Sequence, residues 1–170
     1  MNRLQGKVAI VTGAAGGFGE GIARLFVAEG AKVLIADLDA DKAQQVAASL
    51  GAQARSVRCD VSNRADIDAA LKACVDAFGA PDIVVNNAGT THRNQSMLDV
   101  DETTFDRVFA VNVKSIYHMT QAVVPLMKAR KSGCIVNIGS TAGIRPRPGL
   151  SWYNASKGAV NVLSKSMAAE

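Results

Sequence analysis

Tyr153 and Lys157 are the residues whose types and spacing point most directly to chemistry. They stand at i and i+4, a spacing that on a helix puts both side chains on one face, one turn apart. A phenol is a poor base at neutral pH, and a nearby ammonium group favours its phenolate form. The pair therefore predicts a general acid/base site, although a surface Tyr–Lys pair without a catalytic role fits the same spacing.

Ser140 and Asn112 are two further polar residues at positions where chemistry is expected. Ser140 directly follows an apolar run at residues 134–139, and in α/β proteins ligands bind at the carboxyl ends of such strands. Its hydroxyl could bind a substrate carbonyl or alcohol, or serve only as a loop or cap residue. Asn112 interrupts the apolar face of a predicted helix. A buried amide must be hydrogen-bonded, so we expect Asn112 either to kink that helix or to anchor a water.

A glycine cluster near the N-terminus, TGAAGGFG at residues 12–19, predicts a phosphate-binding turn. A β-branched run at residues 8–11 precedes it, and a helical apolar pattern follows, made of Phe18, Ile22, Leu25 and Phe26. Strand, glycine turn and helix in this order form the first half of a dinucleotide-binding βαβ unit. The glycines let the backbone approach a pyrophosphate, whose charge lies at the helix N-terminus. A plain strand-to-helix turn is the alternative.

Asp37 ends the next apolar strand, expected at residues 31–37. An acidic residue at this place accepts hydrogen bonds from the adenosine ribose and repels a 2′-phosphate. Either Asp37 or Asp39 could instead cap the helix that follows. Because the glycine loop also has no Lys or Arg that could hold a 2′-phosphate, the sequence favours NAD over NADP.

Strand and helix patterns alternate along the whole chain. Further strands are expected at residues 54–59, 82–86 and 134–139, with helices at 40–50, around 67–78, at 102–130 and from 151 onward. Near-continuous apolar strands that alternate with helices predict a parallel sheet covered on both faces. The fold class is therefore α/β, a Rossmann-like doubly wound sheet in a single domain of residues 1–170.

The last helical pattern has apolar residues at Val160, Leu163 and Met167 and reaches Glu170 without a Gly, Asn or Pro to end it. A crossover helix normally leads to another parallel strand. Without one, the strand at 134–139 would form an exposed apolar edge. We therefore expect the domain to be C-terminally incomplete, with residues 1–170 forming the N-terminal part of a longer protein.

Composition and charge argue against several classes of protein. A hydrophobic content of 48% with 20% charged residues is that of an ordinary soluble domain, and a net charge of +4 without basic runs argues against nucleic acid. No apolar run reaches membrane-spanning length. Cys59, Cys74 and Cys134 each lie in an apolar pattern, which indicates buried thiols in a reducing cytoplasm. We expect His92 in a loop near the cleft, His118 exposed or half-buried on a helix, and no metal site.

Together these residues resemble the short-chain dehydrogenase/reductase family over all 170 residues. The matching motifs, in chain order, are Thr12-Gly13-x3-Gly17-x-Gly19, Asp60-Val61, Asn86-Asn87-Ala88-Gly89, Asn112, Ser140 and Tyr153-x3-Lys157. The three-residue gap between the first two glycines looks like the compact single-domain branch of the family.

The resemblance implies a role for each matching position. Tyr153 would be the catalytic acid/base, Lys157 would assist it and hold the nicotinamide ribose, Ser140 would polarise the substrate oxygen, and Asn112 would position a relay water. Cofactor contacts are implied, besides Tyr153 and Lys157, for Gly13, Gly17, Phe18, Gly19, Asp37, Leu38, Asp60, Val61, Asn87, Ala88 and Gly89.

The sequence thus predicts an NAD-dependent oxidoreductase that interconverts a secondary alcohol and a ketone. Two alternatives stay open: a non-catalytic NAD(H)-binding module, and an NADP-dependent 3-oxoacyl-carrier-protein reductase. The substrate is a small molecule that the sequence does not identify. Arg145 and Arg147 could attract a carboxylate or phosphate. The resemblance further implies a homodimer or homotetramer for the full-length protein, with no nucleic-acid or membrane partner.

Overall fold

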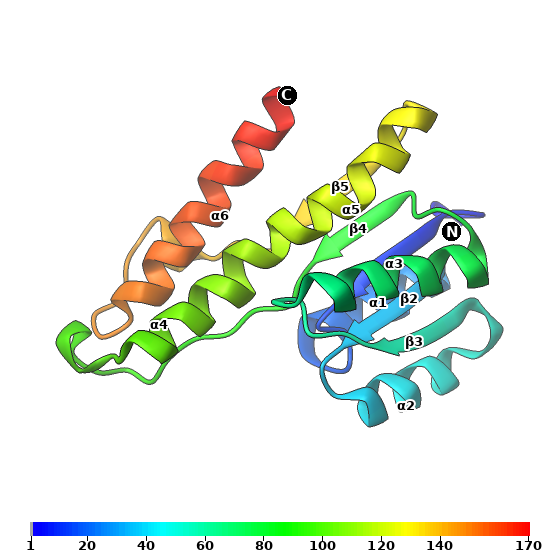
Figure 1. The fold of residues 1–170 in the computed structure, drawn as a ribbon. Helices are drawn as coiled ribbons and strands as arrows, with labels where there is room; N and C mark the ends of the chain where they lie inside the picture. The colour runs from blue at the N-terminus through cyan, green and yellow to red at the C-terminus, as the bar shows by residue number, and fades with distance from the viewer. Residues whose placement is uncertain (1) are drawn as a thin grey trace.

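Five short runs of β-branched and small apolar residues form a parallel sheet in the computed structural model, which describes residues 2–170 (Figure 1). The strands are β1 (Val8–Thr12), β2 (Lys32–Asp37), β3 (Ala54–Arg58), β4 (Ile83–Asn86) and β5 (Cys134–Asn137). Their order in the sheet is β3-β2-β1-β4-β5, and every pairing is parallel. The predicted doubly wound α/β sheet is therefore confirmed.

Helices connect the strands in the order that the apolar patterns predict. They are α1 (Gly17–Ala28), α2 (Ala40–Leu50), α3 (Arg64–Phe78), α4 (Glu102–Phe109), α5 (Ser115–Arg130) and α6 (Ser151–Ala169), with short helical turns at Gly51–Gln53, Met97–Asp99, Ala110–Lys114 and Thr141–Gly143. The turn at Ala110–Lys114 is π-helical. The long helix predicted at 102–130 therefore runs through, with a π-helical turn at Asn112.

Two hydrophobic cores lie on opposite faces of the sheet. One is shared by the sheet with α3 and α5, and the other by the sheet with α1 and α2. Because successive strand residues point to opposite faces, Ile10 enters the first core and Val11 the second, each fully buried. β1 lies between β2 and β4 with all five of its residues buried, so its carboxyl end is held firmly from both sides.

The buried face of α1 matches the predicted one only in part, since Ile22 and Phe26 pack against the second core but Phe18 and Leu25 do not. Phe18 is 84% exposed and Leu25 is 54% exposed, whereas Gly19 and Ala23 are buried. An added Cβ on Gly19 would collide with the carbonyl oxygen of Gly13. α1 therefore approaches the glycine loop and sheet through its smallest residues, and this close contact turns Phe18 and Leu25 toward solvent.

Strand β5 pairs with β4 on one side and, among residues 2–170, has no strand on its other side. Its residues alternate between exposed and half-buried, so the exposed edge predicted for this strand is present. Cys134 is consequently exposed, and the expectation that all three thiols are buried is wrong for this one. Cys59 and Cys74 are buried, and burial raises the pKa of each thiol to about 12.

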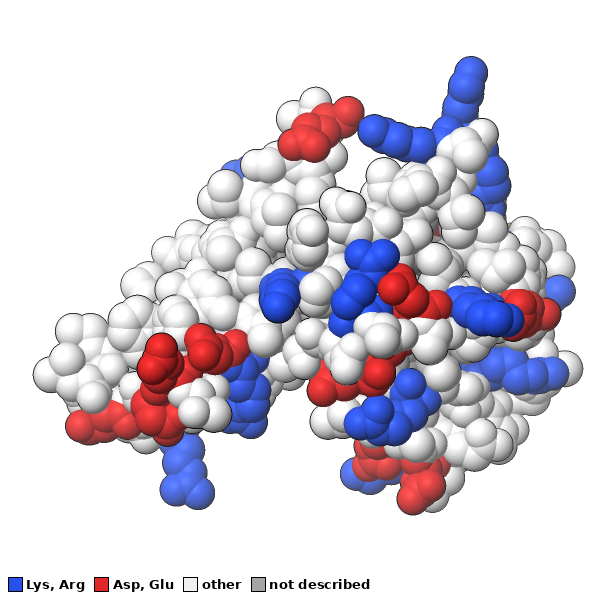
Figure 2. Space-filling view, viewed as in Figure 1, with Lys and Arg blue, Asp and Glu red and all other residues white. Residues whose placement is uncertain are grey.

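The charged surface is mixed rather than sorted by sign. On the face shown in Figure 2, Lys and Arg side chains are interspersed with Asp and Glu, and acidic side chains gather over α4. That helix begins with Asp101 and Glu102, and the Asp101 carboxylate accepts a hydrogen bond from the backbone N–H of Thr104. Acidic groups at this end are favourable because the first turn of a helix carries partial positive charge.

We predict that Gly13→Ala destabilises the fold. Gly13 has a φ of +63°, and an added Cβ would lie 2.8 Å from the Cα of Ala88. A left-handed backbone costs a non-glycine residue about 1–3 kcal/mol, and the clash is with backbone that cannot rotate away. The free energy of unfolding, measured by urea titration followed by far-UV circular dichroism, should fall accordingly.

Gly21→Ala is the matched control within the same segment. An added Cβ there meets nothing within 4 Å, and alanine is favoured over glycine in a helix by about 0.5–1 kcal/mol. This variant should be slightly more stable than the parent chain. Equal stability of Gly13→Ala and the parent would contradict the close approach of the two backbone segments.

Candidate active site

The glycine loop leaves the N-terminus of α1 open toward the carboxyl edge of the sheet. α1 begins after Gly16, which offers no side-chain cap, whereas α2 and α3 are capped by Asp39 and Asn63. An added Cβ at Gly16 or Gly17 would meet nothing within 4 Å. The first N–H groups of a helix have no partner within the helix and attract negative charge. This end of α1 therefore fits the pyrophosphate of a dinucleotide.

Asn87 and Thr12 fix the glycine loop against the end of β4. The side-chain amide nitrogen of Asn87 donates to the carbonyls of Thr12 (2.8 Å) and Gly13 (2.9 Å). In return, the Thr12 hydroxyl oxygen accepts the backbone N–H groups of Asn87 and Ala88, both at 3.1 Å. The Asn87 side chain thus positions the loop, and Thr12, which the sequence analysis named only as part of a motif, is half of that connection.

Asp37 joins the end of β2 to the glycine loop. One carboxylate oxygen accepts the backbone N–H of Ala15 (2.9 Å) and the other accepts the backbone N–H of Asp39 (3.0 Å). The open question of which acid caps α2 is settled by Asp39, whose carboxylate accepts the N–H of Lys42. Hydrogen bonding from Lys42 lowers the pKa of Asp39. Asp37 is therefore held with its carboxylate at the cleft.

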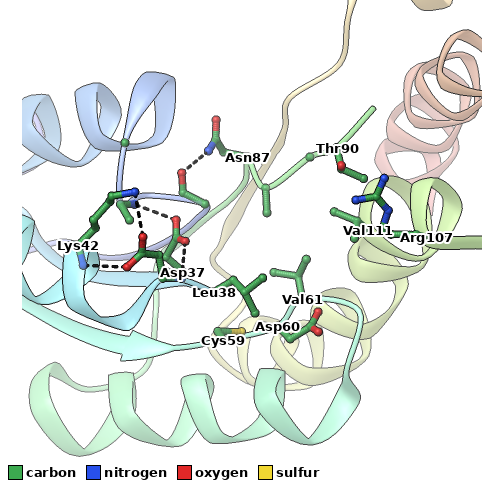
Figure 3. A pocket seen from close by; sticks show the side chains of 16 residues that line it. Asp37, Leu38, Lys42, Cys59, Asp60, Val61, Asn87, Thr90, Arg107 and Val111 are labelled. Atoms are coloured by element: carbon green, nitrogen blue, oxygen red, sulfur yellow. Dashed lines mark hydrogen bonds and ion pairs between the residues drawn. The ribbon is translucent and has the colours of Figure 1, made fainter. Parts of the chain in front are cut away.

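A cleft of about 580 Å³ runs along this edge of the sheet (Figure 3). Asp37 and Leu38 form one wall, Asp60 and Val61 lie at its base as drawn, and Val111 faces them from the π-helical turn. A volume of this size is typical of a small-molecule site. The Asp60 carboxylate accepts hydrogen bonds from both the N–H and the hydroxyl of Ser62, which lower its pKa.

Most of the predicted cofactor residues line this cleft. Those that do are Gly13, Asp37, Leu38, Asp60, Val61, Asn87, Ala88 and Gly89, whereas Gly17, Phe18, Gly19, Tyr153 and Lys157 do not. The residues that the prediction missed are Ala15, Gly16, Asp39, Lys42, Cys59, Thr90, Arg107 and Val111. Six of these adjoin a predicted residue or motif in sequence, which is a usable signal. Lys42 is four residues from Leu38 and Arg107 is five residues from Asn112, so sequence adjacency could not reveal these two.

Asn112 is buried in the π-helical turn, with 2% of its surface exposed. Its side-chain oxygen accepts the N–H of Thr90 (2.8 Å), and its nitrogen donates to the carbonyl of Thr90 (2.9 Å) and the hydroxyl of Ser156 (2.9 Å). Both N–H groups of the amide are thereby used. Of the two expected outcomes, a helix distortion is what the structure shows, and the amide ties three segments together.

Lys157 and Asn112 converge beside Gly89, which lines the cleft. A Cβ added to Gly89 would lie 3.4 Å from Asn112 Oδ1 and 3.5 Å from Lys157 Nζ. Lys157 Nζ donates to the carbonyl of Ile138 (2.8 Å), just past β5. Lys157 is buried, and burial lowers its pKa. The ammonium keeps further N–H donors for a ligand or neighbouring group.

Tyr153 lies on α6, and Ser140 lies in the loop after β5. Tyr153 is half-buried, one turn before Lys157 on α6. Ser140 Oγ accepts the N–H of Ala142 (3.1 Å) and caps the short turn that follows. That turn packs on α6 so closely that a Cβ at Gly143 would lie 2.7 Å from the backbone of Lys157. The turn that Ser140 caps therefore lies against the helix that carries Tyr153, but neither residue is among those that line the cleft.

The two histidines are both buried, which the sequence predicted for neither. His92 lies in the loop after β4, and its Nδ1 is 2.7 Å from the carbonyl of Arg93. His118 was expected exposed or half-buried, but it is 8% exposed because α5 packs against α3 on that side. Burial, with Lys114 and Arg64 nearby, lowers the pKa of His118.

Within residues 2–170, no three His, Cys, Asp or Glu side chains gather closely enough to hold a metal ion. Over the same range, no helix combines the length and the apolar character needed to cross a membrane.

Comparison with known proteins gives a family match over nearly the whole chain. A family model described as short chain dehydrogenase matches residues 7–170. The chain is 49% identical over 170 residues to 4-formylbenzenesulfonate dehydrogenase TsaC1/TsaC2 of Comamonas testosteroni, covering 98% of this chain and 68% of that protein. It is 43% identical to galactitol 2-dehydrogenase of Agrobacterium fabrum, covering 98% of this chain and 65% of that protein. The chain thus spans about two thirds of the length of these relatives.

Solved structures show the same fold with nicotinamide cofactors bound. A 3-ketoacyl-(acyl-carrier-protein) reductase from Brucella melitensis complexed with NADH superposes with a TM-score of 0.94 at 46% identity, over 97% of this chain and 70% of that one. A short chain dehydrogenase/reductase from Burkholderia phymatum in complex with NAD gives a TM-score of 0.93 at 34% identity, over 98% and 60%.

Ser156, which the sequence analysis did not single out, generates a prediction. Its hydroxyl donates to the carbonyl of Tyr153 (2.7 Å) and accepts from Asn112 (2.9 Å), in a fully buried position. Ser156→Ala leaves one N–H of Asn112 without its partner, and a buried donor without a partner costs about 1–3 kcal/mol. Urea unfolding should show a loss of stability of that size.

Ser166→Ala is the control on the same helix. Its exposed hydroxyl donates to the carbonyl of Val162 (3.2 Å) in the same one-turn geometry. Surface substitutions of this kind change stability by about 0.5 kcal/mol or less. If the two variants lose stability equally, Ser156 contributes only as a helix residue and not through Asn112.

Proposed function

Because this chain belongs to the short-chain dehydrogenase family, we propose that it is part of an NAD-dependent oxidoreductase that interconverts a secondary alcohol and a ketone. One observation carries the proposal: Lys157 Nζ and Asn112 Oδ1 meet at Gly89, at one end of a cleft whose other residues suit a dinucleotide. Relatives named for galactitol and for 2-(R)-hydroxypropyl-CoM support an alcohol as the substrate class.

The residues of the cleft fit a nicotinamide dinucleotide. The glycine loop and the uncapped start of α1 would hold the pyrophosphate through backbone N–H groups. Gly17, Phe18 and Gly19 form the first turn of α1. Asp37 would accept the ribose hydroxyls, and Leu38, Asp60 and Val61 would surround the adenine. When bound, the nicotinamide would supply or accept the hydride.

Tyr153 is the proposed acid/base. As phenolate, its oxygen would take the proton of the substrate hydroxyl, and as phenol it would return a proton to a ketone oxygen. Lys157, fixed by its hydrogen bond to Ile138, keeps a buried ammonium one turn away. In this proposal Lys157 assists Tyr153 and holds the nicotinamide ribose.

Ser140 would hold the substrate oxygen. Its Oγ already accepts the N–H of Ala142, so its own hydroxyl proton is the group that remains to be donated. A donor aimed at the oxygen on which charge changes lowers the barrier most, because it needs no reorganisation during the reaction. The hydroxyl would thus bind the same substrate oxygen that exchanges its proton with Tyr153.

Asn112 would act as a positioning residue. Its amide is engaged by Thr90 and Ser156, and through these bonds it fixes the loop after β4, the π-helical turn and α6 relative to one another. The two proposed catalytic residues of α6, Tyr153 and Lys157, would thereby be held in a fixed place relative to Gly89. A relay water near Asn112, which the family resemblance implies, remains part of the proposal.

The choice of NAD rests on the carboxylates of the cleft. Asp37 lies at the expected ribose position, and Asp39 and Asp60 line the same cleft. Three carboxylates disfavour the additional negative charge of a 2′-phosphate. The two structural neighbours described above were solved with NADH and NAD, which supports the same choice.

A second candidate is a reductase of 3-oxoacyl thioesters, which the likeness to the Brucella melitensis enzyme favours. A panel of sugars, polyols and 3-oxoacyl thioesters, assayed by NADH absorbance, would separate the two. A non-catalytic NAD(H)-binding module is the third reading, and binding of NADH without turnover of any of these substrates would favour it. A homodimer or homotetramer and a cytoplasmic location also remain predictions.

We predict that Tyr153→Phe lowers turnover by about 10²- to 10⁴-fold, the usual contribution of general acid/base catalysis. NADH affinity should stay within a few-fold, because the ring is retained and only the hydroxyl is lost. Turnover is followed by NADH absorbance and binding by NADH fluorescence. Tyr117→Phe, at an exposed tyrosine of α5, is the control and should match the parent; a Tyr153→Phe variant with normal turnover would refute the assignment.

We also predict that Asp37→Asn shifts the cofactor preference toward NADPH. Removing this carboxylate charge should raise the ratio of NADPH to NADH affinity by about tenfold, equivalent to about 1.4 kcal/mol. Parallel titrations with both reduced cofactors measure the ratio. Asp41 is an exposed acid in the first turn of α2, and Asp41→Asn should leave the ratio of NADPH to NADH affinity unchanged. Equal ratios in the parent and both variants would show that Asp37 does not bind the adenosine ribose.

A further inference from the structure

More acidic than basic side chains line the cleft, so a bound dinucleotide, which is itself negatively charged, would face an excess of negative charge. Asp37, Asp39 and Asp60 line it, against two cations, Lys42 and Arg107. Lys42 already forms an ion pair with Asp39, with 3.0 Å between its ammonium nitrogen and the carboxylate. Arg107 forms no ion pair with any group in residues 2–170. It is therefore the cation of this cleft that is free for a ligand.

Arg107 also lies in a suitable place. It precedes Val111 by one helical turn, and both line the cleft. Figure 3 shows Arg107, Val111 and Thr90 on the side of the cleft away from Asp37 and Lys42, with the guanidinium drawn near Thr90. A ligand lying between the glycine loop and this wall would pass within reach of the guanidinium.

The helix that carries Arg107 is well anchored. Val108 is fully buried, and the ring of Phe105 packs edge-on against Trp152 of α6 with 5.3 Å between centroids. Asp101 caps the helix, and the charge of Arg107 is the smallest of several influences that lower the pKa of Asp101. The backbone of Arg107 is thus fixed while its exposed side chain remains free to bind.

The ligand that would suit this cation is the phosphate-bearing half of the cofactor. A dinucleotide brings two negative charges in its pyrophosphate, and the glycine loop, TGAAGGFG, offers backbone N–H groups but no cationic side chain. A guanidinium matches the geometry of a phosphate through paired N–H donors, and it can also stack on an adenine ring. Either contact would offset the repulsion from the three carboxylates.

We propose that Arg107 is a cofactor-binding residue, which contacts the AMP half of the dinucleotide from the wall opposite Asp37. The inference rests on the proposed function, because it requires the cleft to bind NAD(H). It adds to that function a side chain from α4, and so makes the adenosine half of the site depend on a helix that also packs against α6.

The test compares ligand fragments on three variants of this chain. Arg107→Met keeps the apolar stem, Arg107→Lys keeps the charge, and Arg93→Met removes an exposed arginine outside the cleft. Affinities for NADH are measured by fluorescence, and those for ADP-ribose, AMP, adenosine and reduced nicotinamide mononucleotide by displacement of NADH. Urea unfolding of each variant checks that the fold is intact.

Arg107→Met should lower the affinity for NADH and for ADP-ribose by about tenfold, as expected for the loss of one charge-assisted contact. Arg107→Lys should recover part of this loss, and Arg93→Met should equal the parent. A loss for AMP but not for adenosine identifies the phosphate as the partner, whereas equal losses identify the adenine ring; both support the proposal. The parent should also lose more ADP-ribose affinity with added salt than Arg107→Met does.

Two results would overturn the inference alone: unchanged ADP-ribose affinity in a folded Arg107→Met, or a loss confined to reduced nicotinamide mononucleotide. In both cases the parent would still bind NADH, so the proposed function would stand. A folded parent chain that binds neither NADH nor NADPH would refute the proposed function, and the role of Arg107 with it.

Discussion

The close approach of β1 and β4 at their carboxyl ends is the constraint on which the rest of the site depends. Asn87 donates to the carbonyl of the last residue of β1 and to that of the next residue, and Thr12 accepts two N–H groups beyond β4. Gly13 has no Cβ to keep the strands apart. Because the connections of the sheet reverse direction between these two strands, a crevice opens there. The uncapped start of α1 and Gly89 consequently face the same cleft.

A second set of contacts connects this crevice to the helices that carry the candidate catalytic groups. Asn112 binds the loop after β4 on one side and Ser156 of α6 on the other, while Lys157 binds the carbonyl that follows β5. Most polar side chains here are therefore used to hold one another. In the proposed function, the hydroxyls of Tyr153 and Ser140 act on the substrate, while Asn112 and Ser156 position the segments around them.

The prediction from sequence succeeded where the information is local. Strand and helix positions follow from apolar periodicity, which neighbouring residues express together, and all five strands were found in this way. The glycine cluster and the acid at the end of β2 sit at fixed places relative to a strand end, so their location at the carboxyl edge followed directly. It failed in part for α1, where Phe18 and Leu25 are exposed, because glycine and alanine allow close packing without contributing to an apolar pattern.

The sequence alone determined the α/β class, the parallel sheet, the glycine turn and the one-turn spacing of Tyr153 and Lys157. Only the tertiary structure decided that His118 is buried, that Cys134 is exposed and that Arg107 lines the cleft. These properties depend on which element packs against which, as do the bonds from Asn112 to Thr90 and Ser156, which lie 22 and 44 residues away. Periodicity describes which face of a helix is apolar, whereas the partner of that face is chosen by the packing of distant segments.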